Sequence, residues 1–448
     1  MTGAGRRTMA ALTGAAALLL LAPAAALADG EEPVAEPQPY RMADDAEPIE
    51  GTERSSDAPR LEGGGTYTDE IAPGQTLYYS IGLDDVSDVY LTTVAAPAPG
   101  TKVGYSDRIE VVLQTTGGDT CLSSDRQNFG ADGLARPITA WSLRAIDPDR
   151  SCQEAGVYHY TVTRDSDPTS SPEPWPLELR VLVEPPVTGG QVNPPSPGSV
   201  LTEPPAPPAD AAERVTGGTG FNDARPVTEG VWRDDIAPGQ TLFYRIPVDW
   251  SQQLALTVEL GNTAAKDDAS WVSDGLTAAL YNPARARLGE EKTSYRGEAE
   301  EMRAITPPVA YDNRYDDLPV SRMRFAGWHY IAVTLHEDVA TVTDEPSIGL
   351  TLRTSLEGEV TAGPDYEDPQ AALDAGFGVR DSDRDQAEKG LSDQEIAADR
   401  RGSQQLLGFA GIGAGVGLLA ALTVWQLTAR RRAAASQPAP PPGGPWAA

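Results

Sequence analysis

An internal repeat is the feature that most constrains how this chain of 448 residues can fold. Residues 70–81 read EIAPGQTLYYSI, and residues 235–246 read DIAPGQTLFYRI. Further along each copy, AGVYHYTVT at 155–163 is matched by AGWHYIAVT at 326–334. Landmarks that recur in the same order indicate that one structural unit occurs twice. The sequence therefore predicts two tandem domains of one fold.

The matched segments also predict which kind of unit is repeated. Leu77, Tyr79 and Ile81 fall on one face of a segment with a period of two, which is typical of a half-buried strand. Each Pro-Gly pair of the repeated APGQ motif predicts a turn, because proline presets φ and glycine accepts a positive φ. Short strands separated by turns predict an all-β protein with two β-sandwiches, at residues 61–184 and 216–356.

The order of these motifs resembles that of the bacterial pre-peptidase C-terminal (PPC) domain. An APGQ turn is followed by alternating strands and then by an AG-x-[YH] strand in both copies. The resemblance implies a jelly-roll-like β-sandwich with an accessory, non-catalytic role beside a secreted peptidase. The chain departs from the family pattern, because we find no peptidase domain beside the two copies.

Two apolar segments predict export and membrane attachment. Residues 1–28 combine a charged start, an apolar run and small residues before a cleavage point, which is typical of a signal peptide. Residues 405–429 carry no charge and are long enough for a bilayer core, which needs roughly 20 apolar residues. Three arginines open the Pro-rich tail at 430–448 and favour a cytoplasmic location for it. We expect a single-pass protein of the cell membrane with an extracellular N-terminus.

Glycines inside the predicted span form two overlapping GxxxG pairs, which let two helix backbones approach closely. They are Gly411, Gly413, Gly415 and Gly417. One interpretation is a homodimer formed through the span. The alternative is that glycine is simply common in membrane helices of proteins rich in alanine and glycine.

Three polar segments separate the predicted domains from one another and from the membrane. Residues 29–60 are acidic and are predicted to be a disordered leader. Residues 185–215 are rich in proline and are expected to form a stiff linker. Residues 357–404 are expected to form an acidic stalk.

The charge of the chain narrows the choice of partner. Lys plus Arg number 35 and Asp plus Glu 66, a net charge of -31. All the acids lie in the exported part and five arginines lie outside it, so that part carries 30 minus 66, or -36. A body this acidic repels phosphate backbones, which excludes nucleic acid. It favours an envelope or membrane protein, or a cation-bridged contact, over anionic wall polymers.

The two cysteines, Cys121 and Cys152, lie in the first copy and within the predicted exported region. Exported proteins fold under oxidising conditions, so we predict a disulfide between them. The second copy has no cysteine. The bridge is therefore an addition to the shared fold.

Candidate metal ligands and binding aromatics occur in the second copy. Oxygen-bearing side chains form one acidic cluster, consisting of Asp312, Asn313, Asp316 and Asp317. We expect such a loop either to bind Ca²⁺ weakly or to be a solvated acidic loop without a ligand. No other cofactor is expected. The aromatic residues form either a sugar-binding platform or part of the core, and they are Trp232, Trp271, Tyr281 and Trp328. His329 is interpreted as a partly buried structural histidine.

The sequence shows no catalytic motif that we recognise. GxSxG, the Walker loop and GxGxxG are missing, and His336-Glu337 has Ala340 where a zincin needs its second histidine. We interpret the chain as a non-catalytic surface binding or accessory protein whose two modules engage one envelope partner with avidity. The alternative is an extracellular hydrolase, related to peptidases or glycosidases, with a divergent carboxylate site at Asp316 or Asp317.

Overall fold

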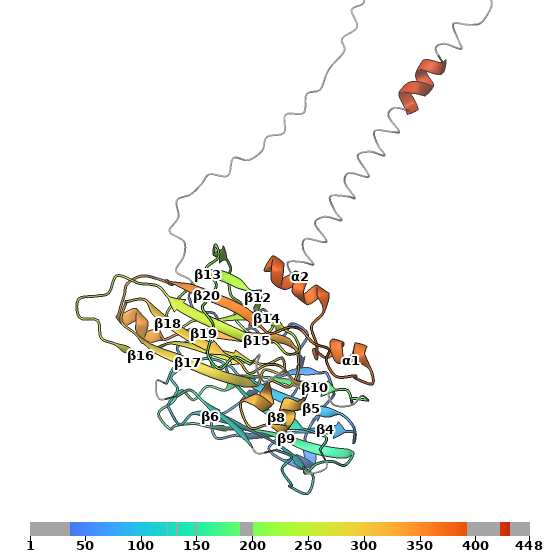
Figure 1. Ribbon diagram of the computed structural model, residues 1–448. Helices are drawn as coiled ribbons and strands as arrows, with labels where there is room; N and C mark the ends of the chain where they lie inside the picture. The colour runs from blue at the N-terminus through green and yellow to red at the C-terminus, as the bar shows by residue number, and fades with distance from the viewer. Residues whose placement is uncertain are drawn as a thin grey trace, which may run out of the picture. The chain divides into compact units, whose positions relative to one another are not determined.

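The computed structural model describes most of the chain between residues 36 and 391 (Figure 1). The described residues are 36–122, 124–130, 133–147, 150–188, 200–391 and 422–430. The predicted signal peptide lies outside them. Most of the predicted span lies outside them too, including Gly411, Gly413, Gly415 and Gly417. Within the described part of the chain, no helix is both long enough and apolar enough to cross a membrane.

The first copy folds into two five-stranded sheets that face each other. Outer sheet 1 has the order β2 (Arg60–Leu61), β4 (Thr76–Leu83), β9 (Gly156–Asp165), β6 (Arg108–Thr115) and β7 (Asp125–Asn128). Inner sheet 1 has the order β1 (Glu47–Pro48), β3 (Thr66–Ile71), β10 (Trp175–Glu184), β5 (Asp88–Ala95) and β8 (Ile138–Arg144). The first two strands of each sheet are parallel, and the remaining pairs are antiparallel.

The second copy repeats this topology strand for strand. Inner sheet 2 has the order β12 (Arg225–Pro226), β14 (Thr241–Val248), β19 (Gly327–Leu335), β16 (Val272–Tyr281) and β17 (Arg287–Tyr295). Outer sheet 2 has the order β11 (Glu213–Arg214), β13 (Gly230–Ile236), β20 (Ile348–Glu357), β15 (Gln253–Leu260) and β18 (Glu300–Ile305). The predicted pair of tandem β-sandwiches is confirmed.

Equivalent side chains make equivalent hydrogen bonds in the two copies. Tyr79 Oη donates to Asp69 Oδ2 at 2.7 Å, and Tyr244 Oη donates to Asp234 Oδ2 at 2.7 Å. Both tyrosines come from the repeated strand and are completely buried. Burial raises the pKa of each phenol well above its usual range, and the aspartate charge adds to this. Both tyrosines therefore stay neutral and serve as hydrogen-bond donors inside the core.

The two sandwiches pack against each other through the outward faces of their inner sheets. All eight residues of β5 are buried, because Leu91 faces its own sandwich core while Val94 faces the second sandwich. Val94 shares an apolar cluster with Ala279 and Tyr330 of inner sheet 2. The four sheets therefore stack as outer 1, inner 1, inner 2 and outer 2 (Figure 1). The sequence predicted two modules separated by a stiff linker; in the structure the two sandwiches form one body.

The predicted disordered leader is folded from residue 36 onward. The ring of Tyr40 lies 6.3 Å from that of Phe221, and the backbone N–H of Ala43 donates to Glu178 Oε2 at 2.7 Å. β1 then pairs with β3. Composition predicted disorder because the segment has few apolar residues. The few buried contacts of the segment, such as that of Tyr40, are enough to order it because they fill the junction between the two sandwiches.

The predicted acidic stalk is also folded, as far as residue 391. It contains the helices α1 (Pro369–Asp374) and α2 (Asp381–Lys389). Phe377 is 2 % exposed, and its ring packs 5.7 Å from Tyr90 and 5.2 Å from Phe325. The start of the predicted linker joins this segment, since Val187 bridges to Tyr366. These contacts hold the C-terminal segment on the junction of the two sandwiches.

Candidate functional site

The open edge of the second sandwich carries an apolar slot. β17 is the last strand of inner sheet 2 and β18 is the last strand of outer sheet 2. The gap between them leads into a cavity of about 100 Å³. Apolar side chains from both sheets line it, namely Leu256, Val258, Ala278, Leu280, Leu288 and Met302. The slot is therefore an opening into the core of the sandwich.

Strand register places one carboxylate at the mouth of the slot. Glu291 of β17 pairs in register with Ala278 of β16, so its side chain lies on the face that Ala278 turns toward the slot. Glu291 is exposed, and among the described residues it has no ion-pair partner. Its neighbour Glu290 lies on the opposite face and is bound by Arg287, at 2.9 Å, and by Lys292, at 3.3 Å.

The size and lining of the slot define what it can hold. An engineered apolar cavity of about 150 Å³ binds benzene. A slot of about 100 Å³ has room for the end of one aliphatic side chain. Fully burying such a side chain contributes on the order of 1.5–3 kcal/mol. The site can therefore anchor one apolar group of a partner.

The structure does not gather the side chains of the predicted acidic cluster around one point. Asn313 is buried, and its amide donates to the carbonyl oxygens of Pro308, at 2.8 Å, and Met323, at 2.7 Å. Asp316 and Asp317 are instead exposed. No group of three or more His, Cys, Asp or Glu side chains in the described part of the chain could hold a metal ion. The amide turns inward because it satisfies backbone carbonyls that would otherwise be buried without a donor.

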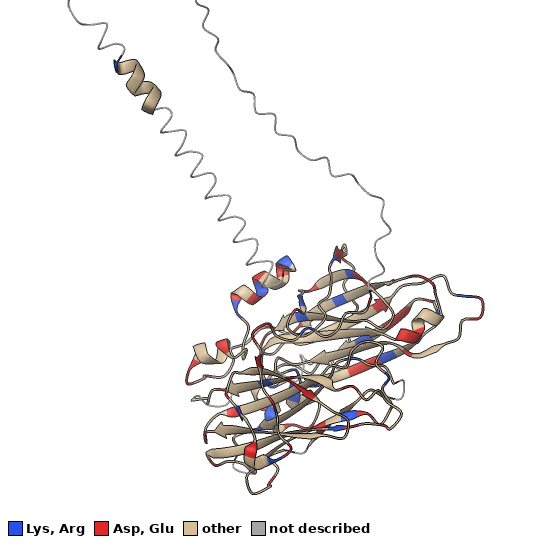
Figure 2. Ribbon diagram, turned by 180° about the vertical axis from the view of Figure 1, so that it is seen from behind, with Lys and Arg blue, Asp and Glu red and all other residues tan. Residues whose placement is uncertain are grey.

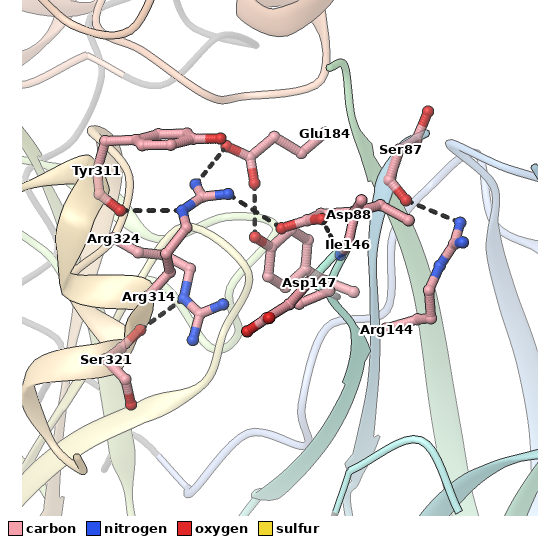
Figure 3. A network of polar contacts seen from close by, with 12 residues as sticks. Ser87, Asp88, Arg144, Ile146, Asp147, Glu184, Tyr311, Arg314, Ser321 and Arg324 are labelled. Carbon is pink, nitrogen blue, oxygen red and sulfur yellow. Dashed lines mark hydrogen bonds and ion pairs between the residues drawn. The ribbon is translucent and has the colours of Figure 1, made fainter. Parts of the chain in front are cut away.

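The same loop sends a positive charge into the junction between the sandwiches. It contains the short 3₁₀ helices η3 (Tyr311–Tyr315) and η4 (Val320–Arg322). Arg314 is 8 % exposed and lies 3.1 Å from both Asp88 Oδ2 and Glu184 Oε1 of the first sandwich (Figure 3). Tyr90 Oη donates to Glu184 at 2.6 Å, and Tyr366 Oη donates to it at 2.8 Å.

The buried positive charge of Arg314 is balanced by the buried carboxylates of Asp88 and Glu184. Burial, followed by the nearby Glu184 carboxylate, raises the pKa of Asp88 above its usual range, while Arg314 opposes that rise. Burial alone would lower the pKa of Arg314, but Glu184 and the surrounding oxygens outweigh it, so the guanidinium stays charged. The network holds both sandwiches and the C-terminal segment in one arrangement.

A second buried ion pair lies elsewhere in the junction. Arg285 Nη1 donates to Glu178 Oε1, and Arg285 Nη2 donates to Asn222 Oδ1 at 2.7 Å. Glu178 also accepts a hydrogen bond from Tyr40 Oη at 3.2 Å. Glu178 is completely buried and Arg285 is 4 % exposed. The folded leader is thus tied to both sandwiches through one carboxylate.

The disulfide prediction is confirmed, since Cys121 and Cys152 are bonded and no free cysteine remains. The bridge joins the loop after β6 to the segment that precedes β9. It lies in the first sandwich only, as the sequence indicated.

The remaining candidates divide between core and surface. His329 is fully buried, and burial lowers the pKa of its imidazole to about 4. Trp232 and Tyr281 are buried on different sheets, while Trp271 is 56 % exposed. The four aromatics therefore do not form one platform. Acidic residues are spread along the strands and loops of both sandwiches (Figure 2).

Sequence reasoning missed the slot and the buried ion pairs. One signal for the junction was available: β10 reads WPLELRVLVE, and its Val181-Leu182-Val183 run does not alternate. Uninterrupted apolar runs are typical of strands that are buried on both faces. Nothing local marked Arg314 or Glu291, because their roles depend on which strands become neighbours.

Comparison with known proteins gave structural similarities only. No protein-family model matches the sequence, and no curated protein matches it. Similar structures include the tandem CBM22-1-CBM22-2 domain of Paenibacillus barcinonensis Xyn10C, 10% identical, covering 66% of this chain and 92% of that one with a TM-score of 0.18. The ANX1 ectodomain of Arabidopsis thaliana is 11% identical, with coverage of 68% and 92% and a TM-score of 0.17. TM-scores this low carry no argument, so the fold rests on the strand pairing described above.

Proposed function

We propose that this chain is a non-catalytic binding protein of the cell surface. It is exported by a signal peptide, held by one transmembrane helix and directed to an envelope protein. The observation that carries the proposal is the apolar slot, because it is a cavity lined by buried core side chains that lies at the edge of the second sandwich, where a partner's apolar side chain could enter. The PPC resemblance supports an accessory role, since domains of that family accompany enzymes without taking part in their chemistry.

The junction between the sandwiches changes how binding would work. Two independent modules would gain avidity by engaging one target separately. Here Arg314 and Arg285 tie the sandwiches together, so the body presents its surfaces in fixed positions. Additional valency would come from a second copy of the chain, through the glycine pairs of the span. The surplus of acidic residues favours a basic protein surface as the partner.

A slot-filling substitution tests this function. Ala304 of β18 lines the slot, is partly exposed and pairs in register with Leu256. Ala304→Phe would occupy the slot from its edge with little strain on the core. We expect the wild-type chain, tagged and solubilised from its own membranes, to co-purify with a specific envelope protein. The Ala304→Phe variant should lose that partner.

A matched control places the same side chain elsewhere. Val157 is 50% exposed at the start of β9 in the first sandwich. Val157→Phe should therefore retain the partner. Recovery of the same partner with Ala304→Phe would contradict a role for the slot. Failure of the wild-type chain to retain any specific partner would contradict the binding function itself.

A further inference from the structure

The edges beside the slot offer backbone groups as well as apolar contacts. β17 and β18 each pair with a neighbour on one side only, among the strands the structure describes. Their other edges carry N–H and C=O groups that can accept an added strand. An extended segment lying along β18 would place alternate side chains over the slot. This geometry suits a flexible or edge-strand segment of a partner.

The charged residues beside the slot determine which kind of extended segment binds there most favourably. Glu291 lies on the slot side of β17 without a cation in the described part of the chain. On β18, Glu301 is paired with Arg303 at 2.6 Å, so these two largely cancel. Arg303 itself borders the slot, whereas Glu300 lies on the same face of β18 as Met302 but outside the slot lining. Among the described residues that line the slot, Glu291 is therefore the charged side chain without an ion-pair partner.

From these observations we propose the class of partner, an inference that rests on the binding function proposed above. The slot takes the apolar side chain of an extended protein segment that carries Lys or Arg within two positions of that anchor. The anchor packs against Leu256, Leu280 and Met302. The neighbouring cation pairs with Glu291. An acidic or purely polar segment would leave the slot empty and place like charges together, which is unfavourable.

The expected effects follow from how exposed each contact is. An ion pair at an exposed rim contributes about 0.2–1 kcal/mol, which corresponds to at most about fivefold in affinity. Glu291→Gln should therefore weaken binding about two- to fivefold. Glu291→Lys should weaken it further, because it adds repulsion. Glu291→Asp should stay close to wild type.

Site-specific photo-crosslinking in the producing cells tests the inference on the full chain. A benzophenone amino acid replaces Arg303, which is exposed on β18 next to the slot. The control carries the same probe at Arg126, which is exposed on β7, the edge strand of outer sheet 1. We expect an adduct from position 303 only, mapped by mass spectrometry to a segment with an apolar residue and Lys or Arg within two positions. Glu291→Lys should reduce the adduct, and replacing the mapped cation by Glu should restore it.

Other outcomes separate this inference from the function on which it rests. An adduct that maps to an acidic or polar segment, or to a second copy of this chain, overturns the partner class. Equal adducts from positions 303 and 126, or none from 303, remove the slot edge as the contact. In each of these cases the co-purification of an envelope protein by the wild-type chain still decides the binding function. An adduct unaffected by Glu291→Lys overturns the role of charge.

Discussion

Removing the guanidinium of Arg314 should cost more stability than removing any surface charge of this protein. Arg314→Met keeps a long apolar side chain but leaves Asp88 and Glu184 without their ion-pair partner. These carboxylates are only 7% and 2% exposed, so water cannot replace the lost charge. Breaking a buried pair by removing one partner typically costs about 3–5 kcal/mol. We expect a loss of that size in the free energy of unfolding near neutral pH.

The loss should depend on pH in a defined direction. Burial and then Glu184 already raise the pKa of Asp88, and Arg314 is what opposes that rise. In Arg314→Met the folded-state pKa of Asp88 therefore rises further above its unfolded value. At a pH above this folded-state pKa, the variant must bury the Asp88 carboxylate in its charged form, which destabilises the fold. At a pH below it, Asp88 is protonated in the folded state and this penalty disappears. The penalty should be larger at about pH 8 than at about pH 5.

Urea denaturation of the full chain, followed by tryptophan fluorescence, measures both effects. Trp141 is a suitable probe, because its ring stacks on Tyr90 at the junction with centroids 6.1 Å apart. Arg41→Met serves as the control, since Arg41 forms an exposed pair with Asp44 and should change little. A loss below about 1 kcal/mol for Arg314→Met, or no dependence on pH, would refute the idea that this charge holds the junction together.

Three further outcomes are expected. Replacing Cys121 and Cys152 by alanine should lower the stability of the first sandwich by about 3–4 kcal/mol, measured by denaturant unfolding, because the bridge no longer closes the loop between these residues, which are 31 positions apart. The pKa of His329 is about 4 in the folded state against about 6.5 unfolded, so the unfolded state binds the proton first. This group alone should lower the stability of the wild type by roughly 3 kcal/mol as pH falls from 6.5 to 4, and His329→Leu should remove that share of the pH dependence. Protease treatment of intact cells should digest the sandwiches and spare the predicted span and tail, and a protected body would contradict the topology.

The local pattern of residues was sufficient to predict the strands and the duplication. The period of two at Leu77, Tyr79 and Ile81 depends only on neighbouring residues and on the burial of one face. The repeated Pro-Gly turns mark where strands end. The disulfide could be predicted because the chain has only two cysteines and both lie in the first copy. Each of these inferences needs only the chemistry of a short stretch of chain.

The segments outside the repeats show where composition misleads. Residues 36–60 and the segment up to residue 391 are acidic, yet both are folded. Their order comes from a few anchors, such as Tyr40 and Phe377, that fill gaps at the junction. An average over composition cannot register such anchors, because their contribution exists only once the two sandwiches meet.

Tertiary structure alone decided the junction and the candidate site. Arg314 finds Asp88 across 226 residues, and Arg285 finds Glu178 across 107. A charged residue is expected to face solvent until its partner is known, so the sequence could not show that these four are buried. Glu291 likewise gains its position from the register of β17 on β16. The sequence by itself determined that two like sandwiches form, since that requires only alternating burial along each strand. How they pack, and where an edge stays open, depended on contacts between residues far apart in the chain.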